Sequence, residues 1–140
     1  MWITLTLSMA ITSAMKVNKA YGDFIGQLPW NIFATLRHPY KINQALTNKW
    51  FTRLMTTSNK VISVFYSIEK DKGDPKSKHV HTLINSTSDL SYDEFRTGLG
   101  NIAVGDYQII NDPKDVANYV TKYFGVYDVD YDLLLKEDRT

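Results

Sequence analysis

Two histidines separated by one residue, His79 and His81, are the side chains of this sequence best suited to chemistry. Side chains alternate between the two faces of a β-strand, so this spacing places both imidazoles on one face. The segment from Val61 to Glu69 is rich in β-branched and aromatic residues and also predicts a strand. If the two strands form a hairpin with Glu69 opposite His79, two imidazoles and one carboxylate converge. Such a set can hold a divalent metal ion and leave coordination positions open.

The pairing register of this hairpin decides whether the site exists. A polar segment from Lys70 to Lys78, with Gly and Pro turn signals, is expected to be the connecting loop. A slip of one residue would turn Glu69 to the opposite face, and the histidines would then be ordinary half-exposed strand residues. In the expected register Ser63 and Ser67 share the face of Glu69. The core face is then formed by Ile62, Val64, Tyr66, Ile68 and Val80.

A second group of reactive side chains lies near the end of the chain. Asp112 and Pro113 predict the start of a helix that runs to about Phe124. Tyr119 and Tyr123 are four residues apart and therefore share one helical face, and Lys122 lies beside them.

A tyrosine hydroxyl has a pKa of about 10 and is a weak nucleophile at neutral pH. A nearby cation favours the phenolate and neutralises charge on a phosphate under attack, and Lys122 is placed to do part of this. Tyrosines four apart on a helix also occur as simple packing pairs. Together with a metal site, however, Tyr119 and Tyr123 provide what metal-assisted transfer of a phosphodiester to tyrosine requires.

Composition limits the class of protein. The chain has 140 residues, of which 44% are hydrophobic and 22% charged, and we expect one soluble domain over residues 1–140. Because the net charge is only +1, any surface that binds nucleic acid must come from local clustering of basic residues. The absence of cysteine excludes disulfides, cysteine–zinc sites and thiol nucleophiles and fits a reducing cytoplasm.

The two ends of the sequence have no assigned role. Residues 1–15 are apolar, but they lack the basic start of a signal peptide and are shorter than the roughly 20 residues of a spanning helix. We therefore expect no membrane partner and interpret this segment as a strand or helix laid on the domain. Residues 127–140 are expected to form a tail that adds a helix or a strand or leads to a further domain.

The order of the predicted elements indicates the fold class. The elements are a strand at Trp30–Arg37, a helix at Lys41–Thr57, the hairpin, a helix after the capping box of Ser91 and Glu94, a strand at Tyr107–Ile110 and the last helix. Gly98 and Gly100 are expected to end the helix that follows Ser91, and Ile102–Gly105 to form a loop or short strand. This order predicts an α+β fold with a central antiparallel sheet and flanking helices.

These motifs resemble those of one enzyme superfamily. His79-Val80-His81 looks like the signature of HUH endonucleases, and Tyr119-Val120-Thr121-Lys122-Tyr123 resembles the two-tyrosine motif of rolling-circle replication initiators of small phages, viruses or plasmids. Glu69 before a Gly-containing loop matches the carboxylate that completes the metal site in that family. Trp30 to Leu36 looks like its first motif, a hydrophobic strand with a threonine. The likeness covers residues 30–125, but the lysine often found after the second tyrosine is absent, and no helicase motif follows.

The resemblance implies a nicking domain with a ferredoxin- or RRM-like sandwich and a site-specific single-stranded DNA endonuclease activity. Glu69, His79 and His81 would hold one Mg²⁺ or Mn²⁺ ion. Tyr119 would form a 5′-phosphotyrosine, Tyr123 would make a second attack, and Lys122 would assist. The protein would act as a monomer or homodimer in the cytoplasm, of the host cell if it is viral.

Other readings remain open from the sequence. A transposase or conjugative relaxase of the same superfamily would share the chemistry, and a non-catalytic RNA- or single-stranded-DNA-binding module would share the sheet. DNA contacts are expected from basic residues beside the site. The two candidate patches are Lys70, Lys72, Lys76 and Lys78 in the hairpin and Arg37, His38 and Lys41 after the first strand.

Overall fold

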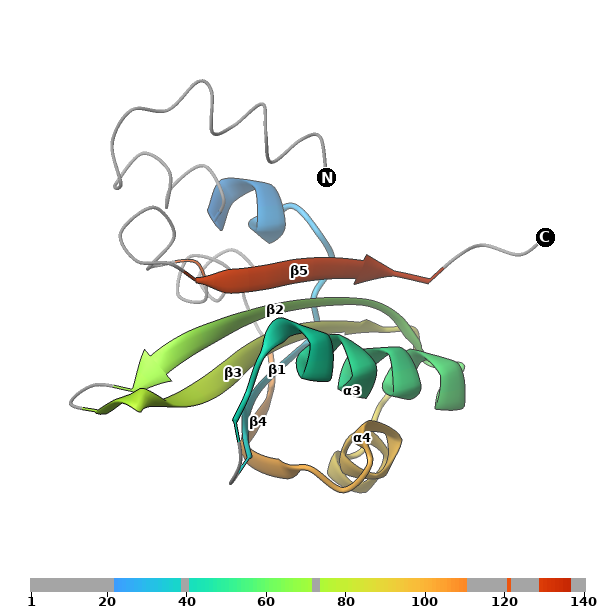
Figure 1. Cartoon of the computed structure of the whole chain (residues 1–140). Coiled ribbons are helices and arrows are strands. Elements are labelled where there is room, and N and C mark those ends of the chain that lie inside the picture. Colours follow the sequence, from blue (N-terminus) through green and yellow to red (C-terminus); the bar gives the residue numbers. More distant parts are fainter. Residues whose placement is uncertain (1–21, 39–40, 72–73, 111–120, 122–128, 137–140) are drawn as a thin grey trace.

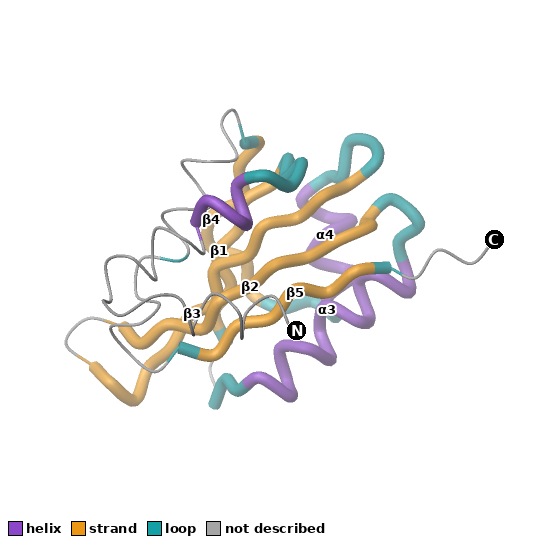
Figure 2. Tube along the Cα trace, turned by 90° about the horizontal axis from the view of Figure 1, so that it is seen from above, coloured by secondary structure: helices purple, strands orange, loops and turns teal. Residues whose placement is uncertain are grey.

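Five antiparallel strands form the centre of the molecule, in the order β4-β1-β3-β2-β5 (Figure 2). The computed structural model describes residues 22–38, 41–71, 74–110, 121 and 129–136. The strands are β1 (Ile32–Arg37), β2 (Val61–Asp71), β3 (Asp74–Ser86), β4 (Ala103–Ile109) and β5 (Asp130–Leu135). The predicted α+β fold with a central antiparallel sheet is confirmed.

Helices cover the two faces of the sheet unequally. Helices α3 (Gln44–Thr57) and α4 (Tyr92–Leu99) pack on one face, and a short helix at residues 22–26 lies on the other (Figure 1). The face under α3 and α4, called the helix face below, carries the larger core. Its most deeply buried side chains include Leu36, Phe51, Leu54, Val64, Tyr66, Val80 and Phe95. No helix in the described part of the chain is long and apolar enough to span a membrane.

The β2–β3 hairpin has the register that the site requires. Glu69 pairs directly with His79 and Ser67 pairs with His81, which is the register on which the expected convergence depends. The expected loop from Lys70 to Lys78 is wrong, because the ladder continues through Lys70 opposite Lys78 and Asp71 opposite Asp74. Polar residues and Pro75 therefore belong to the strands here.

The start of β2 also differs from the prediction. Ile62 was expected on the core face, but it is exposed, while Val61 is fully buried in the core. The register shifts between Val61 and Ser63, and this irregularity breaks the simple alternation at that end of the strand.

Helix α4 confirms one sequence signal and corrects another. The Ser91 hydroxyl accepts a hydrogen bond from the Glu94 amide, and the Glu94 carboxylate accepts one from the Ser91 amide, so the predicted capping box is present. Gly100 ends the helix in the left-handed conformation, with φ of 98°. Gly98 does not end it: it lies inside the helix and packs against Leu54 of α3.

The remaining strands are the outer strands of the sheet. β4 begins at Ala103, so the predicted loop and strand are one continuous strand. The C-terminal tail contributes β5, which pairs with β2 from Ser63 to Ile68. The predicted helix at residues 112–124 lies outside the described residues, except for Thr121.

Candidate metal centre

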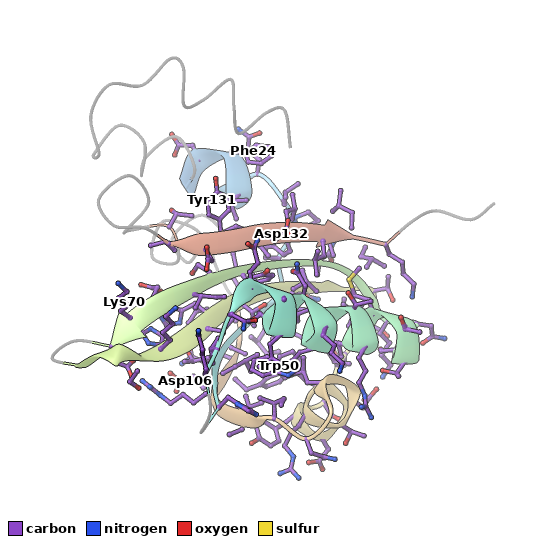
Figure 3. All side chains as sticks on the ribbon, viewed as in Figure 1. Phe24, Trp50, Lys70, Asp106, Tyr131 and Asp132 are labelled. Atoms are coloured by element: carbon purple, nitrogen blue, oxygen red, sulfur yellow. The ribbon has the colours of Figure 1, made fainter. Side chains whose placement is uncertain are left out.

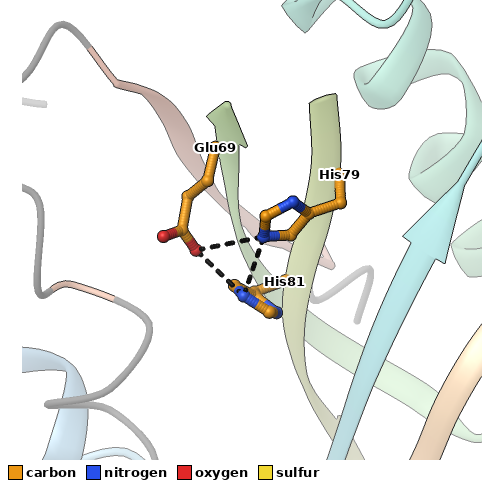
Figure 4. Close-up of side chains that lie close together, drawn as sticks. All are labelled: Glu69, His79 and His81. Atoms are coloured by element: carbon orange, nitrogen blue, oxygen red, sulfur yellow. Dashed lines mark hydrogen bonds and ion pairs between the residues drawn. The ribbon is translucent and has the colours of Figure 1, made fainter. Parts of the chain in front are cut away.

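The two histidines and Glu69 converge on the face opposite α3 and α4, called the ligand face below (Figure 4). The Nε2 atoms of His79 and His81 are 3.1 Å apart. Glu69 Oε2 lies 3.1 Å from His81 Nε2 and 3.9 Å from His79 Nε2. Strand alternation and direct cross-strand pairing thus bring together three predicted metal ligands.

The separations fit one ion bound by three neighbouring ligands. Neighbouring ligand atoms around an ion with bonds of about 2.1 Å lie roughly 3.0 Å apart in octahedral geometry and roughly 3.4 Å apart in tetrahedral geometry. Two of the three separations, both 3.1 Å, are close to these values, and the third, between His79 Nε2 and Glu69 Oε2, is longer at 3.9 Å. The group Glu69, His79 and His81 can therefore hold a metal ion.

Burial of the Glu69 carboxylate favours binding of a cation by this group. Glu69 is 2% exposed and His81 is 5% exposed, so the carboxylate lies almost entirely out of water. An ionised carboxylate in such a place is costly unless positive charge or hydrogen-bond donors compensate it. A divalent ion at the meeting point of Oε2 and the two Nε2 atoms would supply such charge.

An apolar wall adjoins the site on the ligand face. Phe65 and Leu83, from the two hairpin strands, pack against Ile25 and Trp30 of the N-terminal segment. The Phe33 ring stacks on His81, with ring centroids 5.6 Å apart. In Figure 3, Phe24 and Tyr131 lie on the ligand-face side of the sheet, whereas Trp50 lies on the helix-face side. An apolar surround of this kind strengthens electrostatic interactions inside the site.

The far nitrogen of each histidine ring has a polar partner that sequence reasoning missed. Asp71 Oδ1 lies 2.6 Å from His79 Nδ1, and Thr35 Oγ1 lies 3.2 Å from His81 Nδ1. Such contacts orient the rings of metal-binding histidines. Asp71 could have been found from its position two residues after Glu69. This spacing puts both side chains on one face of the strand once β2 is known to continue to Asp71. Thr35 lies in the strand expected at Trp30–Arg37, and its contact with His81 follows only from the pairing of β1 with β3.

Asp71 is itself held by two further residues. Arg37 Nη1 lies 3.1 Å from Oδ1 and 2.9 Å from Oδ2, and Ser77 Oγ donates to Oδ2 at 2.6 Å. These hydrogen bonds, led by that of Ser77, hold the pKa of the Asp71 carboxyl far below its ordinary value despite some desolvation. Arg37, predicted as part of a DNA-binding patch, therefore forms an ion pair with Asp71.

No family model, curated protein or solved structure matches this chain. The chemistry of the site accordingly follows from its own atoms. Tyr119, Lys122 and Tyr123 lie outside the described residues, so their predicted approach to the metal ligands stays a prediction. Thr121, between them, is fully buried.

Three of the four described tyrosines lie away from the ligand face. Tyr66 is buried in the core of the helix face and donates to Asn48, and desolvation raises the pKa of its phenol well above the ordinary value. Tyr107 donates to the Leu90 carbonyl, and burial raises its pKa to about 12. Tyr92 packs edge-on against Tyr107. The fourth, Tyr131, pairs with Ser67 and packs in the apolar wall of the ligand face.

Proposed function

We propose that this protein is a metal-dependent endonuclease that nicks and rejoins single-stranded DNA to initiate rolling-circle replication. The observation that carries the proposal is the convergence of His79 Nε2, His81 Nε2 and Glu69 Oε2 on one sheet face. The tyrosine segment resembles the two-tyrosine motif of HUH replication initiators, and on that resemblance Tyr119 would be the nucleophile. The antiparallel sheet with helices packed on one face is compatible with that family.

The chain's own residues divide the work in this proposal. Glu69, His79 and His81 would hold the ion, which would supply Lewis-acid chemistry at the scissile phosphate. The Tyr119 hydroxyl loses its proton to water, its oxygen attacks phosphorus, the bond from phosphorus to the 3′ oxygen breaks, and the leaving 3′ oxygen takes a proton from water. The products are a 5′-phosphotyrosine and a free 3′ hydroxyl. Tyr123 makes the second attack, and Lys122 stabilises the phenolate or contacts the phosphate.

The ligand set bears on the identity of the ion. Two imidazoles and one carboxylate favour Mn²⁺ over Mg²⁺, because Mg²⁺ prefers oxygen ligands. Cellular supply favours Mg²⁺, so we propose that either ion serves and that Mn²⁺ binds more tightly.

Positive side chains at the end of the β2–β3 hairpin are expected to contact DNA. Lys70 stands directly opposite Lys78 in the β2–β3 ladder, and Lys70 is exposed. Like charges placed opposite each other destabilise a sheet, and a phosphate group would relieve this cost. Phosphate contacts of this kind predict binding that weakens as salt is added.

A covalent-capture experiment tests the proposed function. The protein is mixed with Mn²⁺ and a single-stranded DNA pool that has a randomised centre and a label at its 3′ end, and adducts are resolved after denaturation. The pool removes the need to know the target sequence. We expect a labelled adduct, because a 5′-phosphotyrosine keeps the 3′ part of the strand, and none when the label is at the 5′ end.

Three variants identify the groups responsible. Glu69→Gln is expected to reduce adduct formation at least 100-fold, in line with loss of a metal ligand. The double variant Tyr119→Phe with Tyr123→Phe is expected to form none, whereas Tyr131→Phe, the matched control on the ligand face, retains the adduct. An adduct that survives the double variant, or the absence of any adduct from the wild-type protein, would overturn the proposal.

A further inference from the structure

The two histidines have different partners at Nδ1, and this difference determines how firmly each ring is oriented. His79 meets a carboxylate, Asp71, whereas His81 meets a hydroxyl, Thr35. A hydroxyl can donate or accept, so Thr35 is compatible with hydrogen on either nitrogen of His81. An ionised carboxylate only accepts, so Asp71 is compatible with a single arrangement of the His79 ring.

The surroundings of Asp71 keep it ionised and fixed. Both of its oxygens receive hydrogen bonds, from the Arg37 guanidinium and the Ser77 hydroxyl, in addition to the contact with His79. These partners come from β1 and β3, while Asp71 is the last residue of β2. The carboxylate is therefore restrained by three strands at the end of the hairpin.

We propose that Asp71 is a positioning residue, which keeps hydrogen on Nδ1 of His79 and so turns the Nε2 lone pair toward the ion. The proposal rests on the metal site of the proposed function. A neutral imidazole carries hydrogen on one nitrogen only, and a metal ligand needs a bare nitrogen. Because Nδ1 donates to Asp71 across 2.6 Å, Nε2 is the nitrogen left without hydrogen.

The same contact fixes the direction of the ring. His79 Nε2 lies 3.1 Å from His81 Nε2, so a ring flip would move the bare nitrogen away from the other two ligand atoms. Arg37 and Ser77 act one step further out, because they hold the carboxylate and do not touch the ring. Their removal is expected to have a smaller effect than removal of Asp71.

Metal affinity and ring tautomer, measured on the full chain, test this role. Binding of Mn²⁺ is followed by the electron paramagnetic resonance signal of the free ion. We expect Asp71→Ala to weaken binding 10- to 100-fold, the range typical of such partners. Asp71→Asn, whose amide oxygen still accepts from Nδ1, is expected to lie near the lower end of that range. Arg37→Gln and Ser77→Ala are each expected to cause a change of about threefold or less.

A matched control separates position from charge. Asp106→Asn removes one negative charge from an exposed site on β4 and is expected to leave Mn²⁺ affinity within about twofold. If Asp71→Ala binds Mn²⁺ as tightly as Asp106→Asn does, the proposal is wrong.

The tautomer of the His79 ring is a second measurement, and a general loss of stability would not change it. The chain has three histidines, so ¹⁵N spectra of the ring nitrogens, recorded without metal at about pH 8, resolve each ring. We expect His79 to carry hydrogen on Nδ1 in the wild-type protein and to shift toward Nε2 in Asp71→Ala. A wild-type His79 with hydrogen on Nε2 would overturn the inference.

The outcomes distinguish this inference from the proposed function. A protein that binds Mn²⁺ with Asp71-dependent affinity but forms no DNA adduct keeps the positioning role and loses the nicking activity. A wild-type protein that binds no Mn²⁺ overturns the metal site and the proposed function with it, while the ring tautomer still shows whether Asp71 orients His79. Unchanged circular dichroism of Asp71→Asn shows that the fold is intact.

Discussion

The two faces of the central sheet are built from alternate residues of the same strands, yet one face forms the larger core and the other carries the candidate metal ligands. On β3, Val80 is fully buried in the core of the helix face, while its neighbours His79 and His81 turn to the ligand face. On β2, Ile68 is in the core and Glu69 is a candidate ligand. The helix face gains stability from buried apolar area, whereas the ligand face buries a carboxylate beside two imidazoles, at a cost that a bound cation would reduce. Substitutions on the two faces should therefore differ in size and in metal dependence.

The largest effect is expected from the helix face. Phe51 is fully buried and stacks on Tyr66 with ring centroids 5.5 Å apart. Phe51→Ala should lower the free energy of unfolding by about 3–5 kcal/mol, with or without metal, because it leaves a cavity under α3. Urea denaturation followed by tryptophan fluorescence measures this loss.

Two further variants serve as controls for this measurement. Thr52→Ala changes the exposed neighbour of Phe51 on the same helix and should alter stability by no more than about 0.5 kcal/mol. If Phe51→Ala does not fold, Phe51→Leu should fold with a loss of about 1 kcal/mol. A loss for Phe51→Ala that appears only in the absence of metal would contradict the division between the faces.

On the ligand face, we expect an effect that depends on metal. Glu69→Gln keeps the size of the side chain and removes a buried charge, so without metal its stability should remain within about 1 kcal/mol of the wild type. With Mn²⁺ at 100 times the dissociation constant, the wild-type protein should gain about 2.7 kcal/mol and Glu69→Gln almost nothing. Thermal unfolding with Mn²⁺, Mg²⁺ or a chelator measures the difference. Equal stabilisation of both proteins would show that Glu69 is not a ligand.

The sequence allowed prediction of the convergence of the three candidate metal ligands because the relevant rules are local. Two-residue alternation places His79 and His81 together, and one hairpin pairing adds Glu69. The same rules cannot supply Thr35, because its contact with His81 depends on β1 pairing with β3 across 46 residues. Nor can they supply the bonds from Arg37 and Ser77 to Asp71, which require the strands to continue past the expected loop.

Irregular pairing and tertiary packing account for the errors in the predicted fold. Ile62 follows the expected alternation in sequence, but the register shift near it turns Val61 inward instead. Gly98 looks like a helix terminator when only local preferences are considered. In the folded chain it lies where α4 approaches α3, and this contact is not visible in the sequence around Gly98.

Gly98 offers the smallest of these effects and tests how tightly the helix face is packed. A Cβ atom added at Gly98 would lie 2.5 Å from Leu54 Cδ1, and Leu54 is fully buried. Alanine favours a helix over glycine by about 1 kcal/mol, but forcing an extra methyl group into a packed interior costs about 1–3 kcal/mol. Gly98→Ala should therefore lower the free energy of unfolding by about 1 kcal/mol and leave Mn²⁺ affinity unchanged.

In the double variant with Leu54→Ala, the added methyl group should recover stability relative to Leu54→Ala alone, because it then fills space instead of clashing. A stabilised single variant would mean that α3 and α4 separate easily, and that the helix face is less rigid than the ligand face it supports.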